Sequence, residues 1–213
     1  MSAQGHTVVV AGATSAAGVA VTRGLVDAGA RVIATGRSAQ RLEAVRDAGA
    51  EVAVADATSL HDMQELAVRL DAIDGVVSLV GGWRGGGGLA GQSDDDFDAL
   101  LPALQAVRAT SRAFDELLRA SDAGRFAIVS SVAVTRPLAG GANYAAVKAA
   151  SEAWARAVAQ GFAKGARESG EALRAASVVF RVKALDPAVL SSAVVRLWDA
   201  GADELNDSVI DLG

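Results

Sequence analysis

The 213-residue sequence contains no cysteine, only two histidines and only three prolines. Without cysteine, disulfide frameworks, cysteine nucleophiles and thiolate metal sites are excluded. His6 and His61 lie far apart in the sequence, so we expect no histidine-based metal site. The scarcity of proline argues against proline-rich linkers, and the 23 glycines are therefore expected at particular turns.

Neither sign of charge dominates, since 20 basic and 25 acidic residues give a net charge of −5. Such a chain lacks the basic surface that sequence-independent nucleic-acid binding requires, and we expect no nucleic-acid partner. Hydrophobic residues make up 51 % of the sequence, which is typical of a globular chain. The length predicts a single domain over residues 1–213.

The apolar stretch Thr7–Thr22 is the nearest approach to a targeting segment. No positively charged region precedes it, as a signal peptide would require, because the first charged side chain is Arg23. Gly12, Ser15 and Gly18 within the stretch argue against a membrane span. We therefore expect a cytoplasmic protein with no membrane partner.

Short apolar runs alternate with amphipathic stretches along the chain. Continuous apolar runs are typical of strands that are buried on both faces of a parallel sheet. The runs predict strands at Thr7–Ala11, Arg31–Thr35, Glu51–Ala55, Gly75–Val80, Phe126–Ser130, Ser177–Val182 and Asp207–Ile210. The amphipathic stretches predict helices at Ala17–Ala28, Ala39–Ala48, Leu60–Ile73, Asp95–Ala120, Tyr144–Lys164 and Ala188–Ala200. This alternation predicts a doubly wound α/β domain with a mostly parallel, seven-stranded sheet.

The first predicted strand runs into a glycine-containing turn, and a helix follows. Glycines at such a turn let the backbone approach a pyrophosphate, and the helix N-terminus supplies amide donors and a positive dipole. We therefore predict that a dinucleotide is bound here. The predicted contacts are Gly12, Thr14, Ser15, Ala16, Ala17 and Gly18.

The end of the second predicted strand, Thr35-Gly36-Arg37-Ser38, contains no carboxylate. An acidic side chain at this point binds the ribose hydroxyls of NAD, whereas Arg37 can pair with a 2′-phosphate. The sequence therefore favours NADP(H), with NAD(H) possible and a solvated Arg37 as the alternative. Asp56 and Ala57 are predicted cofactor contacts, with the Asp56 carboxylate accepting a hydrogen bond from the adenine amino group. Helix capping is the alternative role of Asp56.

The segment Gly81–Gly88 is rich in glycine and follows the fourth predicted strand. It is either a surface loop or a wall whose bare backbone lies against the cofactor while Trp83 covers a substrate. Val80, Gly81 and Gly82 are predicted cofactor contacts on the second interpretation. The acidic run Asp94–Asp96 is best explained as the start of a helix.

Tyr144 and Lys148 lie four residues apart at the start of a predicted helix, which places both side chains on one helix face. An ammonium near a phenol lowers its pKa and suits tyrosine to proton transfer near neutral pH. Ser131, thirteen residues before Tyr144, ends the fifth predicted strand at the same edge of the sheet. A serine there can hold a carbonyl oxygen beside the only tyrosine of the chain.

These residues together resemble the short-chain dehydrogenase/reductase family over essentially the whole chain. The likeness implies a Rossmann-like domain and an oxidoreductase that uses a nicotinamide cofactor on a small carbonyl or alcohol, and Arg37 makes NADP the preferred cofactor. It implies that Tyr144 is the proton donor or acceptor and that Ser131 orients the substrate. It further implies that Lys148 lowers the pKa of Tyr144 and binds the nicotinamide ribose, with Val182 as another cofactor contact.

The chain departs from the family pattern at four places. Ala16 replaces the middle glycine of the turn, and Ser78-Leu79-Val80-Gly81 replaces the usual Asn-Asn-Ala-Gly. Leu104 aligns with the catalytic asparagine, and the Pro-Gly after the sixth strand is replaced around Phe180-Arg181-Val182. The C-terminal third is also short, which predicts an open or unusual substrate pocket.

Several alternatives stay open. Quinonoid dihydropteridine reductases look similar at Val80-Gly81-Gly82-Trp83 and also lack the asparagine, so pterin reduction is a second candidate. The departures also fit a non-catalytic sensor of NADP. The resemblance implies a homodimer or homotetramer through two long helices that carry Phe114, Trp154 and Phe162, unless these side chains face the sheet.

Overall fold

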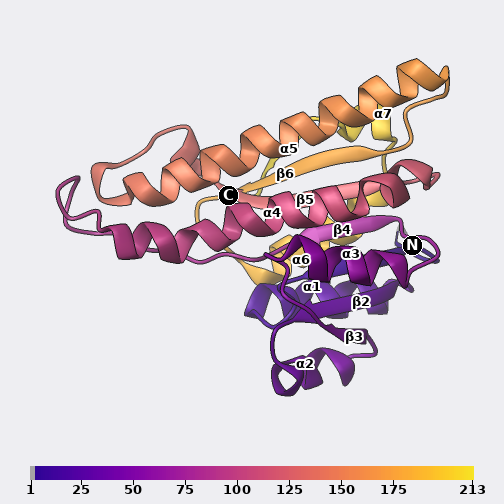
Figure 1. Cartoon of the computed structure of the whole chain (residues 1–213), viewed down its shortest axis with the longest axis horizontal. Coiled ribbons are helices and arrows are strands. Elements are labelled where there is room, and N and C mark those ends of the chain that lie inside the picture. The colour runs from indigo at the N-terminus through magenta and orange to yellow at the C-terminus, as the bar shows by residue number, and fades with distance from the viewer. Residues whose placement is uncertain (1–2) are drawn as a thin grey trace.

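The computed structural model, which describes residues 3–213, contains seven β-strands in one sheet (Figure 1). Their order is β3-β2-β1-β4-β5-β6-β7, and all six pairings are parallel. The strands are β1 (Thr7–Ala11), β2 (Arg31–Gly36), β3 (Glu51–Val54), β4 (Gly75–Ser78), β5 (Arg125–Ser131), β6 (Ala176–Val182) and β7 (Ser208–Asp211). The predicted α/β class is confirmed, and residues 1 and 2 of the predicted domain lie outside the described part.

Seven α-helices connect the strands in the described part of the chain. They are α1 (Ala16–Asp27), α2 (Ala39–Arg46), α3 (Leu60–Val68), α4 (Asp94–Ala120), α5 (Ala142–Ser169), α6 (Pro187–Val195) and α7 (Ala202–Leu205). Short 3-10 helices lie at Val132–Val134, Ala139–Gly141 and Arg196–Trp198. In Figure 1, α4 and α5 begin on the left, beyond the carboxyl ends of the strands.

Two apolar cores cover the two faces of the sheet because successive strand residues point to opposite sides. Val8 and Val10 of β1 pack with α1, α2 and α6, whereas Val9 packs with α3, α4 and α5. Phe114 of α4 and Phe162 of α5 are buried in the second core. These two side chains therefore face the sheet, as one of the two alternatives held.

The predicted element ends differ from the structure at several places. α3 ends at Val68 instead of residue 73, and β4 ends at Ser78, two residues earlier than predicted. The predicted helix at 188–200 ends at Val195 and continues as a 3-10 turn that seats Trp198 against the sheet. The Trp198 ring lies so close to Gly75 that a β-carbon there would be 2.9 Å from it, so packing determines this end.

Arg125 ties several segments together at the amino edge of the sheet. Its buried guanidinium donates hydrogen bonds to the carbonyl oxygens of Gly124, Arg174, Leu197 and Ala200 at 2.8 to 3.1 Å. These acceptors come from separate stretches of the chain, and each offers a partner to a donor that water cannot reach. The arginine therefore fastens the C-terminal segment to β5.

Candidate functional site

The turn between β1 and α1 is shaped by its two glycines. Gly12 has a φ of +83°, and a β-carbon there would lie 3.0 Å from the backbone of Leu79. A β-carbon at Gly18 would lie 2.5 Å from the carbonyl oxygen of Gly12. Ser15 caps α1 by accepting a hydrogen bond from the Gly18 amide at 3.0 Å. The tight turn brings the N-terminus of α1 to the carboxyl edge, where its dipole favours an anion.

Two adjoining cavities run along this edge on either side of β1 and β4, where the strand order reverses. Ligands bind at such a point in open α/β sheets. The first cavity is lined by the predicted residues Gly12, Thr14, Ser15, Arg37, Asp56, Ala57, Val80, Gly81 and Gly82. The second is lined by Ser15, Ala16, Ala17, Val80, Gly81, Gly82, Tyr144, Lys148 and Val182. Of the predicted residues, Gly18 and Ser131 line neither cavity, because both are buried behind the walls.

Three arginines and one carboxylate line the first cavity. Arg37 and Arg41 are exposed, and Arg41 donates a hydrogen bond to the carbonyl oxygen of Thr14 at 3.4 Å. Arg84 enters from the other side. The sequence interpretation missed Arg41, although its place one turn into α2 and four residues after Arg37 could have indicated it. This wall offers guanidinium groups to an anion.

Asp56 has a role in its own turn. One of its carboxylate oxygens accepts hydrogen bonds from the amide and the hydroxyl of Thr58, at 2.9 and 2.8 Å. Ser59, not Asp56, caps α3. The helix-capping alternative for Asp56 is therefore wrong, while its place in the cavity wall agrees with the other prediction.

Tyr144, Lys148 and Ser131 meet at the wall of the second cavity. Lys148 is buried, and its ammonium donates a hydrogen bond to the carbonyl oxygen of Val129 at 2.7 Å. The same nitrogen lies 5.8 Å from the centre of the Tyr144 ring. Ser131 ends β5, where its hydroxyl accepts a hydrogen bond from the Ala133 amide at 3.2 Å and its side chain is near enough to Tyr144 to act on the phenol pKa. The predicted juxtaposition of these three residues is present.

The pKa values in this group are set mainly by burial. Burial lowers the pKa of Lys148 to about 8, against the opposing charge of Glu152. Burial also raises the pKa of Tyr144, and the hydrogen bond with Ser131 opposes that rise. The net shift of the Tyr144 pKa is therefore upward because burial of the phenol dominates, and the lowering expected from Lys148 stays a prediction.

The glycine-rich loop is fastened to the start of α5. The side-chain amide of Gln92 donates to the carbonyl oxygens of Gly86, Gly88 and Gly140 at 3.0 to 3.2 Å. Its oxygen accepts a hydrogen bond from the amide of Asn143 at 3.2 Å. The loop is therefore held in place, and Gly81, Gly82 and Trp83 at its start line the second cavity, with 63 % of the Trp83 surface exposed; contact with a cofactor stays a prediction.

Leu104, an apolar residue, occupies the position at which the resemblance places the catalytic asparagine. Leu104 packs with Ala103 and Val147 in a small apolar cluster that also contacts Tyr144. Leu104 therefore offers no hydrogen bond at this point behind the tyrosine. Within the described residues, no cluster of metal-ligating side chains occurs and no helix is long and apolar enough to cross a membrane.

The family model for short chain dehydrogenases matches residues 6–166 of the sequence. The chain belongs to the short-chain dehydrogenase/reductase family. This assignment identifies it as an oxidoreductase, in agreement with the cavity at the carboxyl edge. No curated protein matches the sequence.

Solved structures with the same fold are numerous and distant in sequence. One named as a short chain dehydrogenase/reductase family protein has a TM-score of 0.81 and 23 % identity, covering 100 % of this chain and 98 % of that one. A short-chain type dehydrogenase/reductase from Mycobacterium ulcerans has a TM-score of 0.82 and 18 % identity, covering 99 % and 89 %. One named as a short chain dehydrogenase from Shigella flexneri 2a, complexed with NADP, has a TM-score of 0.82 and 20 % identity, covering 98 % and 97 %.

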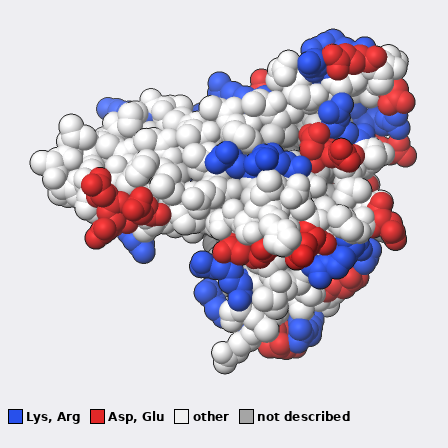
Figure 2. All heavy atoms as spheres, in the orientation of Figure 1, with Lys and Arg blue, Asp and Glu red and all other residues white. Residues whose placement is uncertain are grey.

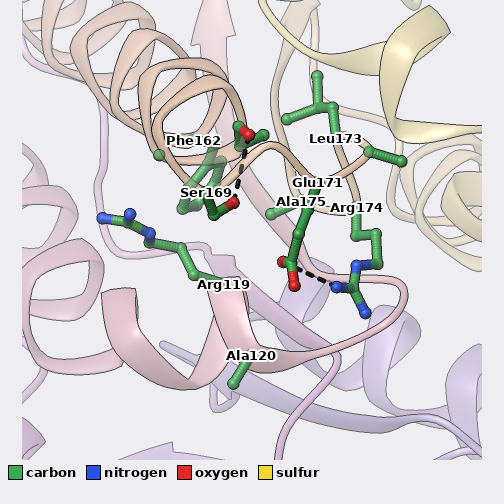
Figure 3. Close-up of a pocket in the computed structure, with 11 residues that line it drawn as sticks. Arg119, Ala120, Phe162, Ser169, Glu171, Leu173, Arg174 and Ala175 are labelled. Carbon is green, nitrogen blue, oxygen red and sulfur yellow. Dashed lines mark hydrogen bonds and ion pairs between the residues drawn. The ribbon is translucent and has the colours of Figure 1, made fainter.

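A further pocket of this short-chain dehydrogenase lies at the opposite ends of α4 and α5 (Figure 3). Arg119, Glu171 and Arg174 are its charged lining residues. Arg174 bonds to Glu171 at 2.9 Å and also to Asp122, and Arg119 pairs with Asp115 at 3.5 Å. Because these charges are paired and lie far along α5 from Tyr144, we assign no ligand to this pocket.

Proposed function

We propose that the protein is an NADP-preferring oxidoreductase that transfers a hydride between the nicotinamide and a small carbonyl or alcohol substrate. The observation that carries the proposal is the continuity of two cavities, one lined by arginines and the other by Tyr144 and Lys148. An oxidoreductase of this family needs both an anchor for the dinucleotide and a proton-transfer group. The chain supplies the two at neighbouring points of one sheet edge.

The residues of the first cavity fit a dinucleotide that carries a 2′-phosphate. The N-terminus of α1 faces the pyrophosphate position, and Arg37 with Arg41 would bind the additional phosphate. Asp56 is the only carboxylate among the lining residues and already accepts two hydrogen bonds from Thr58. The NADP bound to the Shigella flexneri protein supports the same cofactor here.

The side chains of the second cavity would manage the proton. The nicotinamide supplies the hydride when it is bound. Tyr144 donates its phenolic proton to the substrate oxygen during reduction, and its raised pKa keeps that proton available at neutral pH. Ser131 lies buried behind the cavity wall, so it would orient the substrate oxygen only through its place beside the Tyr144 phenol, and the ammonium of Lys148 would stabilise the phenolate that remains.

The outer part of this cavity would receive the body of the substrate. Trp83, Leu185 and Pro187 line it, and 47 % of the Leu185 surface is exposed. No carboxylate lines the cavity. Figure 2 shows that the protruding left end of this face is largely uncharged, apart from one acidic cluster and basic groups just below it and at the upper edge. These surfaces favour a substrate with an apolar or aromatic group beside the carbonyl.

Turnover of a carbonyl panel with NADPH tests the proposal, with the Tyr144→Phe variant as the diagnostic. Loss of the phenolic proton should lower kcat by about 10²- to 10⁴-fold, the usual contribution of general acid catalysis. The dissociation constant for NADPH, followed by nucleotide fluorescence, should stay unchanged. Retained turnover in this variant would contradict the assigned role, and NADPH binding without turnover of any carbonyl or pterin would favour a sensor.

The assembly is proposed as a homodimer or homotetramer through α4 and α5. The proposal rests on the family resemblance; within one chain, Trp154 of α5 donates a hydrogen bond to Ser111 of α4 at 2.9 Å and is contacted by the Arg108 guanidinium. It also lines a surface hollow with Val158 and Gly161. Light scattering at micromolar concentration tests the proposal, and a monomer would overturn it.

A further inference from the structure

A buried ion pair lies directly behind the proposed catalytic lysine. Arg181 of β6 donates two hydrogen bonds to Glu152 of α5, from Nε to one carboxylate oxygen at 3.2 Å and from Nη2 to the other at 2.8 Å. Only 4 % of the Glu152 side chain and 13 % of the Arg181 side chain are exposed. Paired charges at such depth are costly to place, so their location calls for a reason.

Tyr144, Lys148 and Glu152 occupy successive turns on one face of α5. A spacing of four residues makes each the neighbour of the next along the helix. A carboxylate one turn from a buried ammonium is its natural partner, because both charges lose water there and attract strongly. Lys148 nevertheless bonds to the carbonyl oxygen of Val129.

Arg181 accounts for this arrangement. The guanidinium occupies both oxygens of Glu152 in a bidentate contact, which fixes the carboxylate toward β6. Arg181 pairs with Ser130 in the sheet register, next to the pair formed by Ser131 and Val182. It therefore stands at the catalytic edge, in the segment where this sequence departs from the Pro-Gly of its family.

We propose that Arg181 is a positioning residue for Lys148: by holding the carboxylate of Glu152, it leaves the ammonium on the Val129 carbonyl and beside Tyr144. Without Arg181, the unpaired carboxylate would draw the ammonium one turn along α5, away from the phenol. The inference rests on the proposed catalytic role of Tyr144 and Lys148.

Few charged groups bear on Lys148. Glu152 and Tyr144 face it from α5, and Arg181 stands behind Glu152 on β6. Asp211 of β7 acts on Arg181 from the neighbouring strand. The β5 strand contributes the uncharged Val129 carbonyl. Removal of the Arg181 charge should therefore leave Glu152 to act on Lys148 unopposed.

The experiment measures the titration of Lys148 directly, by NMR of protein with isotope-labelled lysine. The chain has only three lysines, Lys148, Lys164 and Lys183, so Lys164→Arg and Lys183→Arg variants assign the signals. We expect the midpoint to rise in Arg181→Gln and to fall below the wild-type value in Arg181→Gln/Glu152→Gln. Arg181→Lys keeps a cation and should lie near wild type.

Kinetics with NADPH and a carbonyl substrate supply the second readout. At pH 6, chosen to keep Lys148 protonated, Arg181→Gln should lower kcat about tenfold or more, and the double variant should recover most of that loss because no carboxylate competes for the ammonium. If the ion pair were purely structural, the double variant would have a lower kcat than Arg181→Gln, or kcat would fall while the Lys148 midpoint stayed unchanged. Either result would overturn the inference.

The two proposals can fail separately. If wild-type protein neither binds NADPH nor reduces a carbonyl, the proposed function fails and the positioning role falls with it. If wild-type turnover depends on Tyr144 while the Lys148 midpoint is the same in all variants, only the positioning role of Arg181 is wrong. Should Arg181→Gln not fold, Glu152→Gln and Arg181→Lys test the same competition, with a lower midpoint expected in the first.

Discussion

The ammonium of Lys148 lies 5.8 Å from the centre of the Tyr144 ring, and the neighbouring Ser131 side chain opposes the rise that burial causes in the pKa of the same phenol. Serine thus acts on the hydroxyl that exchanges a proton, and lysine approaches the ring. A cation within about 6 Å of an aromatic ring is attracted to its face. The two neighbours therefore have different roles. Ser131 acts where the proton is exchanged, and Lys148 stabilises the negative charge on the phenolate.

The rate of carbonyl reduction should decline in alkaline solution with a midpoint near pH 8. Burial lowers the pKa of Lys148 to about 8, so the ammonium is protonated below that pH and loses its charge above it. The phenolate is then less stabilised, and proton donation slows. The measurement is kcat/KM with NADPH between pH 6 and 10. Lys164→Arg, at an exposed position on α5, is the control, and a rate that is unchanged through pH 9.5 would contradict the assignment.

Replacement of Arg37 or Arg41 by alanine should weaken NADPH binding about tenfold, since each removes one charge-assisted hydrogen bond at an exposed site. NADH lacks the 2′-phosphate, so its affinity should not change. Fluorescence titration with both nucleotides gives the comparison. Arg46→Ala is the matched control on α2, because Arg46 pairs with Glu43 and does not line the cavity. Equal weakening of both nucleotides would reject a phosphate site here.

Trp83→Ala should raise KM selectively for aromatic substrates. A pair that shares one reactive group separates this effect: 1-phenyl-1,2-propanedione carries a phenyl group where 2,3-butanedione carries a methyl group. Loss of the ring should cost the first compound about tenfold in KM, as expected for one aromatic contact, and the second little. Leu89→Ala is the control, because Leu89 is exposed in the same loop outside the cavity wall. A similar loss for both diketones would argue against an aromatic wall.

Arg125→Met should destabilise the fold by about 2–4 kcal/mol, because it leaves several buried carbonyl oxygens without a donor. Arg125 is 4 % exposed, and its guanidinium donates hydrogen bonds to four of them. Urea unfolding of the variant gives the free energy of unfolding. The exposed Arg23→Met is the control. NADPH affinity of the folded fraction should be unchanged, since Arg125 lies at the opposite edge from the cavities.

Much of the fold could be predicted because it depends on local patterns. The apolar runs located every strand of the sheet to within a few residues, and parallel strands buried on both faces leave a clear record of this kind. The turn at Gly12 could be predicted for the same reason. The element ends could not, because Trp198 and its contact with Gly75 determine where α6 gives way.

The site could be predicted where its residues are close in sequence and not where they are distant. Tyr144 and Lys148 are separated by one helical turn, and the helix period places them together. Arg181 and Glu152 are 29 residues apart, and Gln92 and Asn143 are 51 apart. Contacts of this type depend on which strand lies beside which helix, and no local pattern encodes that.

The guanidinium of Arg125 has a consequence for how the substrate end of the molecule can change. It anchors the chain at Leu197 and Ala200, just beyond the segment Val182–Pro187 that forms the far wall of the second cavity. Because Arg125 holds the chain at the opposite edge of the sheet, residues of the cavity wall can be substituted without loss of these hydrogen bonds. Substitutions in Val182–Pro187 should therefore change substrate preference without disturbing the hydrogen bonds of Arg125 at the amino edge.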